Sequence, residues 1–459
     1  MKEFVEKLLA GIWNRFASRS RRKVSHHGLR LGFRVRDDSV TRSPFEIPQA
    51  KRAEHLAILG VTGSGKTKLM HSLQKTDIEE GRGFVNFDLH GDTTPFLLGT
   101  IAAEEHRLGC DLSEKLIVVR PSDTLYSVGL NFLEGTAGHH RFVQIAEFAQ
   151  VLKQRWQLES FGARTDELLR NALCAIADNG LTLLEVTPFL RHNEFRAACL
   201  KWVTNQEVRQ YFELRYNQAS EAMQAVMAEA ILNKISVFGT DPHFRHLVGQ
   251  SKSTFSLIEA LDQGRWLLFD LPKGELGEQA TTFASISFTA LAHAIFPRKS
   301  RRLVTLYCDE MQNLAANDSG IETVLSEARK FSVGVVSANQ HLDQYPPAML
   351  SAILAVGTHA FFRLSSPDAR FIANALDGGK SLAELLRNLP QRHAVVKSGG
   401  GRWQEIQVPT INEPKIDYAD LYDRSRKRWA RRRDEIEREI GVRQAIARRT
   451  KEEALRDWE

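Results

Sequence analysis

The chain has 459 residues, of which 42% are hydrophobic and 26% are charged. These values are ordinary for a globular protein, and the length allows two or three domains. The four cysteines are scattered without a Cys-x-x-Cys pair, which argues against a zinc site or disulfide framework and fits a reducing cytoplasm. No run reaches the 18 apolar residues of a membrane span, and charges interrupt the first apolar positions, which argues against a signal peptide.

The net charge of +6 is unevenly distributed along the chain. Residues 1–52 carry 13 Lys and Arg against 5 Asp and Glu, and residues 423–459 carry 13 against 9, so the part between them has a net charge of −6. Basic ends of this kind suit nucleic acid or an anionic membrane surface. At the C-terminus, an ordinary solvated helix face would explain the same composition equally well.

The first 50 residues form a basic N-terminal segment. Apolar residues at helical spacing predict an amphipathic helix over residues 2–17. Such a helix could lie on a membrane surface, dock on a partner or pack against its own domain. Residues 28–50 predict short strands and turns.

A complete P-loop follows an apolar run at residues 56–59 and precedes a helix-like stretch at residues 68–74. Its residues are Gly60, Val61, Thr62, Gly63, Ser64, Gly65, Lys66 and Thr67. The glycines let backbone N–H groups turn toward nucleotide phosphates. Lys66 can reach the β- and γ-phosphates, and the Thr67 hydroxyl can ligate Mg²⁺, so we expect ATP and Mg²⁺ as cofactors.

Strands and helices alternate on both sides of a helical block, which predicts an α/β fold with a doubly wound, mainly parallel sheet. The expected strands cover residues 83–88, 115–119, 266–270, 303–308, 333–337 and 360–364, and residues 281–296 read as a buried helix. The block at residues 137–238 reads as an inserted all-α domain, in which Thr182 to Glu185 resembles a capping box.

The domain organisation follows from this alternation. We assign residues 51–136 and 239–410 to the ATPase domain and residues 411–459 to a charged helical tail. Within that tail, residues 422–459 read as one long exposed helix for which the sequence suggests no function. Within the helical block, residues 207–235 are mostly helix-prone, with Asn217, Ser220 and Asn233 as weaker positions.

The strand at residues 303–308 runs into Asp309 and Glu310, which is the Walker B pattern. Asp309 can hold Mg²⁺ through water, and Glu310 can orient and deprotonate the attacking water. Gln340 follows the next strand and can sense the γ-phosphate, or it can be an ordinary turn residue. Arg329 is either a surface cation or a residue that enters the nucleotide site of a neighbouring subunit.

Taken together, these motifs resemble the TraD/TraG branch of the FtsK–HerA superfamily of P-loop motor ATPases. The segments that carry the resemblance are residues 55–67, 88–92, 129–132, 164–173, 262–277, 308–313, 327–330 and 338–340. The resemblance covers residues 50–400 and implies a RecA-like domain with an inserted all-α domain. It further implies a ring of six subunits with nucleotides at their interfaces, Arg329 acting in trans, Gln340 as the sensor and a basic central channel for DNA.

One departure from that family is the absence of transmembrane helices. The protein would then be cytoplasmic, or peripheral at the inner face of the membrane through a partner or residues 2–17. The function expected first is an ATP-driven motor that moves DNA, with a relaxase and a type IV secretion channel as partners. The alternatives are a HerA-like DNA translocase in repair or phage defence and a nucleotide-switched oligomer that recruits cargo.

Overall fold

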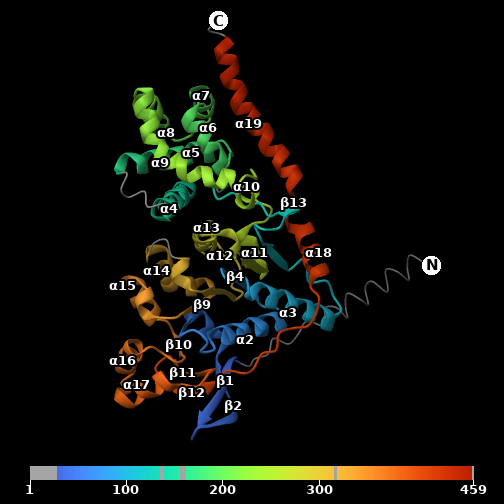
Figure 1. Cartoon of the computed structure of the whole chain (residues 1–459), viewed down its shortest axis with the longest axis vertical. Helices are drawn as coiled ribbons and strands as arrows, with labels where there is room; N and C mark the ends of the chain where they lie inside the picture. Colours follow the sequence, from blue (N-terminus) through green and yellow to red (C-terminus); the bar gives the residue numbers. More distant parts are fainter. Residues whose placement is uncertain (1–27, 135–138, 156–161, 315–317, 457–459) are drawn as a thin grey trace, which may run out of the picture.

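The computed structural model describes residues 28–134, 139–155, 162–314 and 318–456 (Figure 1). The amphipathic helix expected over residues 2–17 lies outside these ranges. In the described part of the chain, no helix combines the length and apolar character that crossing a membrane requires.

An 11-stranded sheet forms the centre of the molecule, in the order β2-β1-β12-β11-β10-β3-β9-β8-β4-β7-β5. Its strands are β1 (Leu29–Arg36), β2 (Ser39–Ile47), β3 (Leu56–Leu59), β4 (Gly83–Asp88), β5 (Leu116–Val119), β7 (Trp266–Asp270), β8 (Val304–Asp309), β9 (Val333–Asn339), β10 (Thr358–Phe361), β11 (His393–Ser398) and β12 (Gln404–Gln407). All pairings from β10 to β5 are parallel, and those among β10, β11, β12, β1 and β2 are antiparallel. The expected doubly wound, mainly parallel α/β sheet is therefore confirmed.

One strand prediction needed correction, and two neighbouring strands were not predicted. The strand expected at residues 360–364 is β10 and ends at Phe361, because only residues 358–361 pair with β3 and β11. Strands β11 and β12 were not predicted; they pair with each other in an antiparallel manner and carry polar residues at intermediate exposure.

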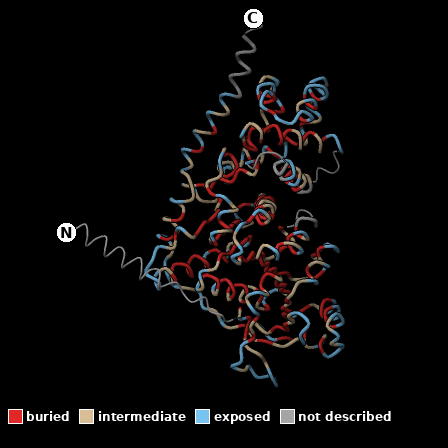
Figure 2. Tube along the Cα trace, turned by 180° about the vertical axis from the view of Figure 1, so that it is seen from behind, coloured by how far each residue is buried: buried red, intermediate tan, exposed pale blue. Residues whose placement is uncertain are grey.

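Helices cover both faces of the parallel strands. Successive side chains of a strand point to opposite faces, so neighbouring residues of one strand are buried in different apolar clusters. On β4, for example, Phe84 packs in one apolar cluster while Val85 and Phe87 pack in another. Helices α2 (Lys66–Glu79) and α3 (Thr93–Leu108) cover the first face, and α11 (Leu257–Gln263), α13 (Glu278–Ile295) and α14 (Asp318–Glu327) cover the second. Figure 2 shows the buried residues as a band through these layers.

A smaller apolar cluster lies on one side of β10 and β11. It includes residues of α16 (Ser366–Ala375) and α17 (Gly379–Asn388), and residues of α15 (Pro347–Leu354) pack against it. Helix α13 confirms the buried helix expected at residues 281–296, since most of its side chains are buried.

The residues between β6 (Tyr126–Ser127) and α11 are mainly helical, and their helices lie above the sheet in Figure 1. Their helices are α4 (His139–Arg155), α5 (Ala163–Asp178), α6 (Val186–Arg191), α7 (Asn193–Leu200), α8 (Gln206–Gln210), α9 (Glu221–Thr240) and α10 (Pro242–Val248). The capping box from Thr182 to Glu185 is present. The helix-prone stretch at residues 207–235 is interrupted between Tyr216 and Glu221, at two of the three weaker positions, whereas Asn233 stays inside α9.

The C-terminal residues do not form the single exposed helix that was expected. Helix α18 (Ala419–Trp429) packs beside β5, and the short strand β13 (Arg431–Arg432) pairs with β6. Helix α19 (Arg433–Arg456) then contacts α7 and α10, as Figure 1 shows (red beside green). Its Ile436 and Ile440 are fully buried, so the tail joins the sheet to the helical block. Helical periodicity alone did not reveal this because the two buried isoleucines stand among charged residues.

Candidate functional site

The P-loop lies at the carboxyl edge of the parallel strands, between β3 and α2. Two of its glycines have positive φ, +74° at Gly63 and +119° at Gly65, a region that side chains other than glycine rarely adopt. Gly65 is the N-cap of α2 and supplies no side-chain cap, so the first amides of the helix remain directed toward the loop. A helix N-terminus of this kind attracts anions.

Lys66 is positioned where a phosphate would be held. Its ammonium is largely buried and donates to the carbonyls of Gly60 at 2.7 Å and Val61 at 3.3 Å. Burial lowers the pKa of Lys66, while the carboxylates of Asp309 and Glu310 act in the opposite direction. Among the described residues, the buried Ser64 hydroxyl has no hydrogen-bond partner. The free amides, the cation and this hydroxyl fit a bound phosphate chain.

The Walker B residues lie at the same edge. Strand β8 is separated from β3 only by β9, and because the three strands are parallel their carboxyl ends face the same way. Burial raises the pKa of Asp309 to about 6, against the effect of the Lys66 charge. Asp309 and the half-buried Thr67, in the first turn of α2, are the residues that would hold Mg²⁺.

Glu310 is held in a fixed position by its backbone and by its neighbours. It adopts a left-handed conformation with φ of +51°, and its N–H donates to the carbonyl of Ala338 at 2.8 Å. Its carboxylate accepts from the side-chain amides of Asn313 at 2.8 Å and Gln340 at 3.0 Å. The carboxylate therefore faces the P-loop edge with both oxygens oriented.

A chain of hydrogen bonds connects the P-loop to Glu310 through Gln340. The Thr62 hydroxyl donates to the side-chain oxygen of Gln340 at 2.9 Å, and the Gln340 amide donates to Glu310. Gln344 accepts from the backbone N–H groups of Gln340 and His341 and so fixes the turn after β9. The structure thus brings together Thr62, Glu310 and Gln340, three residues selected from separate segments of the sequence.

His90 is a site residue to which the sequence analysis gave no role. Its imidazole lies 3.6 Å from the Glu310 carboxylate, and this interaction lowers the pKa of Glu310 to about 2 and raises that of His90. The loop that carries it is shaped by Asp88, whose carboxylate accepts from the N–H groups of His90, Gly91 and Thr94. The available signal was the position of His90 just after β4, the strand beside β8.

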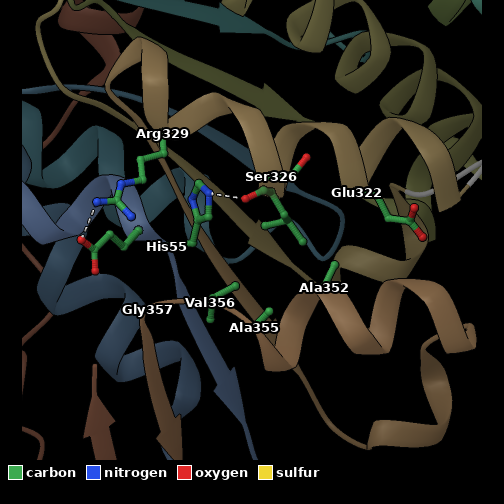
Figure 3. Close-up of a pocket in the computed structure, with 10 residues that line it drawn as sticks. His55, Glu322, Ser326, Arg329, Ala352, Ala355, Val356 and Gly357 are labelled. Carbon is green, nitrogen blue, oxygen red and sulfur yellow. Dashed lines mark hydrogen bonds and ion pairs between the residues drawn. The ribbon is translucent and has the colours of Figure 1, made fainter. Parts of the chain in front are cut away.

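Arg329 does not reach this site within one chain. It precedes β9, whereas Gln340 follows it, so the strand separates them by about 20 Å. The Arg329 side chain is 64% exposed and pairs with Glu54 at 3.1 Å (Figure 3). The remaining predicted site residues lie at the carboxyl edge of the sheet, and Arg329 lies at the amino edge.

Known proteins share both the sequence pattern and the fold of this chain. The family described as "Helicase HerA, central domain" matches residues 41–273, just over half of the chain. The structure is similar to that of the plasmid coupling protein TrwB in complex with the GTP analogue GDPNP, with a TM-score of 0.60 and 17% identity over 84% of this chain and 92% of TrwB. It is also similar to VirB4 of Thermoanaerobacter pseudethanolicus, with a TM-score of 0.55 and 14% identity over 86% of this chain and 98% of VirB4.

These structural similarities, at such low identity, establish the fold, which is the expected RecA-like P-loop ATPase fold. No curated protein sequence matches the chain. The sequence match covers the P-loop and the loop of His90, and the structure adds the Walker B residues at the same edge. The chain therefore belongs to the HerA helicase central-domain family of P-loop ATPases.

Proposed function

We propose that this protein is an ATP-hydrolysing motor that moves DNA, and that it works as a ring of six copies. The observation that carries the proposal is the hydrogen-bonded chain from Thr62 through Gln340 to Glu310. Simple nucleotide binding needs only the groups that bind phosphate, which are the P-loop amides, Lys66 and Ser64 and are called the phosphate cradle below. Hydrolysis also needs an oriented base. A carboxylate fixed beside the cradle supports hydrolysis.

The residues of the site divide the chemistry among them. The P-loop amides and Lys66 bind the phosphates of ATP, and Thr67 and Asp309 would hold Mg²⁺, which would supply charge neutralisation at the phosphates. Glu310 orients the attacking water and accepts its proton. Gln340 keeps Glu310 in place and links its position to the P-loop. The similar protein TrwB has been solved in complex with ADP and Mg²⁺, which supports this cofactor pair.

DNA as the substrate is supported by the family and by charge. The matching family is described as a helicase domain, and the similar structure belongs to a plasmid coupling protein. The chain has basic ends that suit phosphate contacts. We propose that single-stranded DNA, together with a relaxase, is moved toward a type IV secretion channel, from a cytoplasmic position at the inner face of the membrane.

In a ring, Arg329 would act on the nucleotide of the neighbouring copy. Its distance from its own P-loop excludes action within one chain, and its exposure leaves it accessible to a neighbour. Positive charge at that point would stabilise the negative charge that develops on the transferring phosphate. Mixing Arg329→Ala with Lys66→Ala subunits should then restore part of the turnover that each variant lacks, and mixed rings without recovery would refute this role.

The first experiment is steady-state ATP hydrolysis with and without single- and double-stranded DNA, at two salt concentrations. Lys66→Ala is the control, because turnover must disappear when the cradle loses its cation. We expect strong stimulation by single-stranded DNA that decreases with salt. Stimulation by duplex DNA alone would favour a translocase in repair or defence. Turnover indifferent to DNA in assembled protein would refute the motor and favour a cargo-recruiting switch.

A further inference from the structure

A cavity lies at the amino edge of the sheet, opposite the P-loop. It has a volume of about 350 Å³ and opens between the start of β3, helix α14 and helix α15 (Figure 3). Glu54, His55, Arg329 and Gly357 are among the residues that line it, and Gly357 lies below His55 and Arg329 in Figure 3. The catalytic arrangement described above uses none of these residues except Arg329.

Glu54 is the more buried member of the ion pair with Arg329. Its carbonyl accepts from the N–H of Gly357 at 2.6 Å, and a side chain at Gly357 would approach the Glu54 Cβ to 2.5 Å. The backbone of Glu54 is thus held against Gly357, and its side chain is 23% exposed. Arg329, whose side chain is 64% exposed, reaches the Glu54 carboxylate from the outside.

His55 holds the segment that carries Arg329 against the sheet. Its buried imidazole accepts from the N–H of Val335 at 3.0 Å and donates to the carbonyl of Leu325 at 2.9 Å. Burial lowers the pKa of His55 to about 4, so the ring is neutral at physiological pH and adds no second positive charge beside Arg329. Its backbone, at φ of +69°, turns the chain so that Glu54 and His55 face the same cavity.

We propose that Glu54 is a latch that holds the Arg329 guanidinium in the free subunit and releases it to the nucleotide phosphates of a neighbouring copy. This inference rests on the proposed trans action of Arg329. An ion pair this exposed is weak, so a phosphate chain of higher charge can displace the carboxylate. Each subunit interface must therefore break one Arg329–Glu54 pair to form, and this cost raises the protein concentration at which the ring becomes active.

The test compares Glu54→Gln with Glu327→Gln. Both remove one carboxylate from the same region, but Glu327 pairs with Lys330 instead of Arg329. ATP turnover is measured against protein concentration, and ring formation is measured by sedimentation in the presence of a non-hydrolysable ATP analogue. For Glu54→Gln we expect the concentration at half-maximal turnover to fall about two- to fivefold, with the same maximal turnover per subunit. Glu327→Gln should match the wild type.

Four further results separate the latch from the other possibilities. A half-maximal concentration that stays the same or rises in Glu54→Gln refutes the latch. Full turnover in Arg329→Ala refutes the trans action itself. Any shift in the half-maximal concentration of Glu54→Gln would then have another cause. On the Arg329→Ala background, Glu54→Gln should no longer change sedimentation. If Glu54→Gln unfolds at a lower temperature than the wild type, Glu54→Asp is the second variant, because it shortens the side chain by one methylene. It must lower the half-maximal concentration in the same way, or the proposal fails.

Discussion

Replacing Gln340 by alanine tests the hydrogen-bonded chain on which the proposed hydrolysis depends. The substitution removes the bond to the ionised Glu310 at 3.0 Å and the bond from the Thr62 hydroxyl at 2.9 Å. A hydrogen bond to a charged group contributes about 1.5–3 kcal/mol. If the bond to Glu310 must be present in the transition state, turnover should fall by about 10- to 150-fold.

The assay separates turnover from binding. Gln340 does not belong to the phosphate cradle, so nucleotide affinity should change by less than about threefold while kcat falls. Thr62→Val gives a graded comparison, because it removes only the neutral bond, worth about 0.5–1.5 kcal/mol. Its turnover should therefore lie between those of the wild type and Gln340→Ala. Equal kcat for Gln340→Ala and the wild type, in protein of the same oligomeric state, would refute the role of Gln340.

Other perturbations test the catalytic base, the core and the pH dependence. Glu310→Gln should bind ATP but turn it over at least about 100-fold more slowly, and ATP should stabilise its oligomer; normal hydrolysis would show that Glu310 is not the base. The buried guanidinium of Arg52 is bound by the Asp77 carboxylate at 2.7 Å, and Asp77→Asn removes that carboxylate. The free energy of unfolding, measured in urea, should then fall by about 3–5 kcal/mol. A loss under about 1 kcal/mol would contradict the role of the ion pair. Burial lowers the pKa of His71 from 6.5 to about 4, because the folded protein favours the neutral imidazole. The contribution of neutral His71 to the free energy of unfolding is complete above pH 6.5. It is lost as the pH falls toward 4, by up to about 3 kcal/mol. His71→Gln should show a shallower loss of stability over that pH range, and an identical pH profile would exclude His71 as its source.

Much of the nucleotide site was predictable because its chemistry is local in sequence. A P-loop needs its glycines, lysine and threonine at fixed spacing, so Gly60 to Thr67 could be recognised without a fold. Strands buried on both faces are also recognisable, since they read as apolar runs. Strands β11 and β12 were missed because each is short and carries polar residues beside its few buried ones, so neither reads as an apolar run.

Contacts between residues far apart in the chain could not be predicted from the sequence. His90 interacts with Glu310 across 220 positions of the chain only because β4 and β8 are neighbours in the sheet. The packing of α19 against the helical block was hidden for a similar reason. Its polar face forms ion pairs with residues far back in the chain, among them Glu437 with Arg245 and Arg443 with Glu185.

The sequence by itself determined the phosphate cradle, the acidic strand end and the class of fold, since each depends on the order and spacing of nearby residues. Only the tertiary structure decided which of these groups meet. The order of parallel strands places Lys66, Glu310 and Gln340 at one edge of the sheet. The length of β9 places Arg329 at the other edge, beside Glu54. Strand order is a property of the whole sheet, and short-range spacing does not determine it.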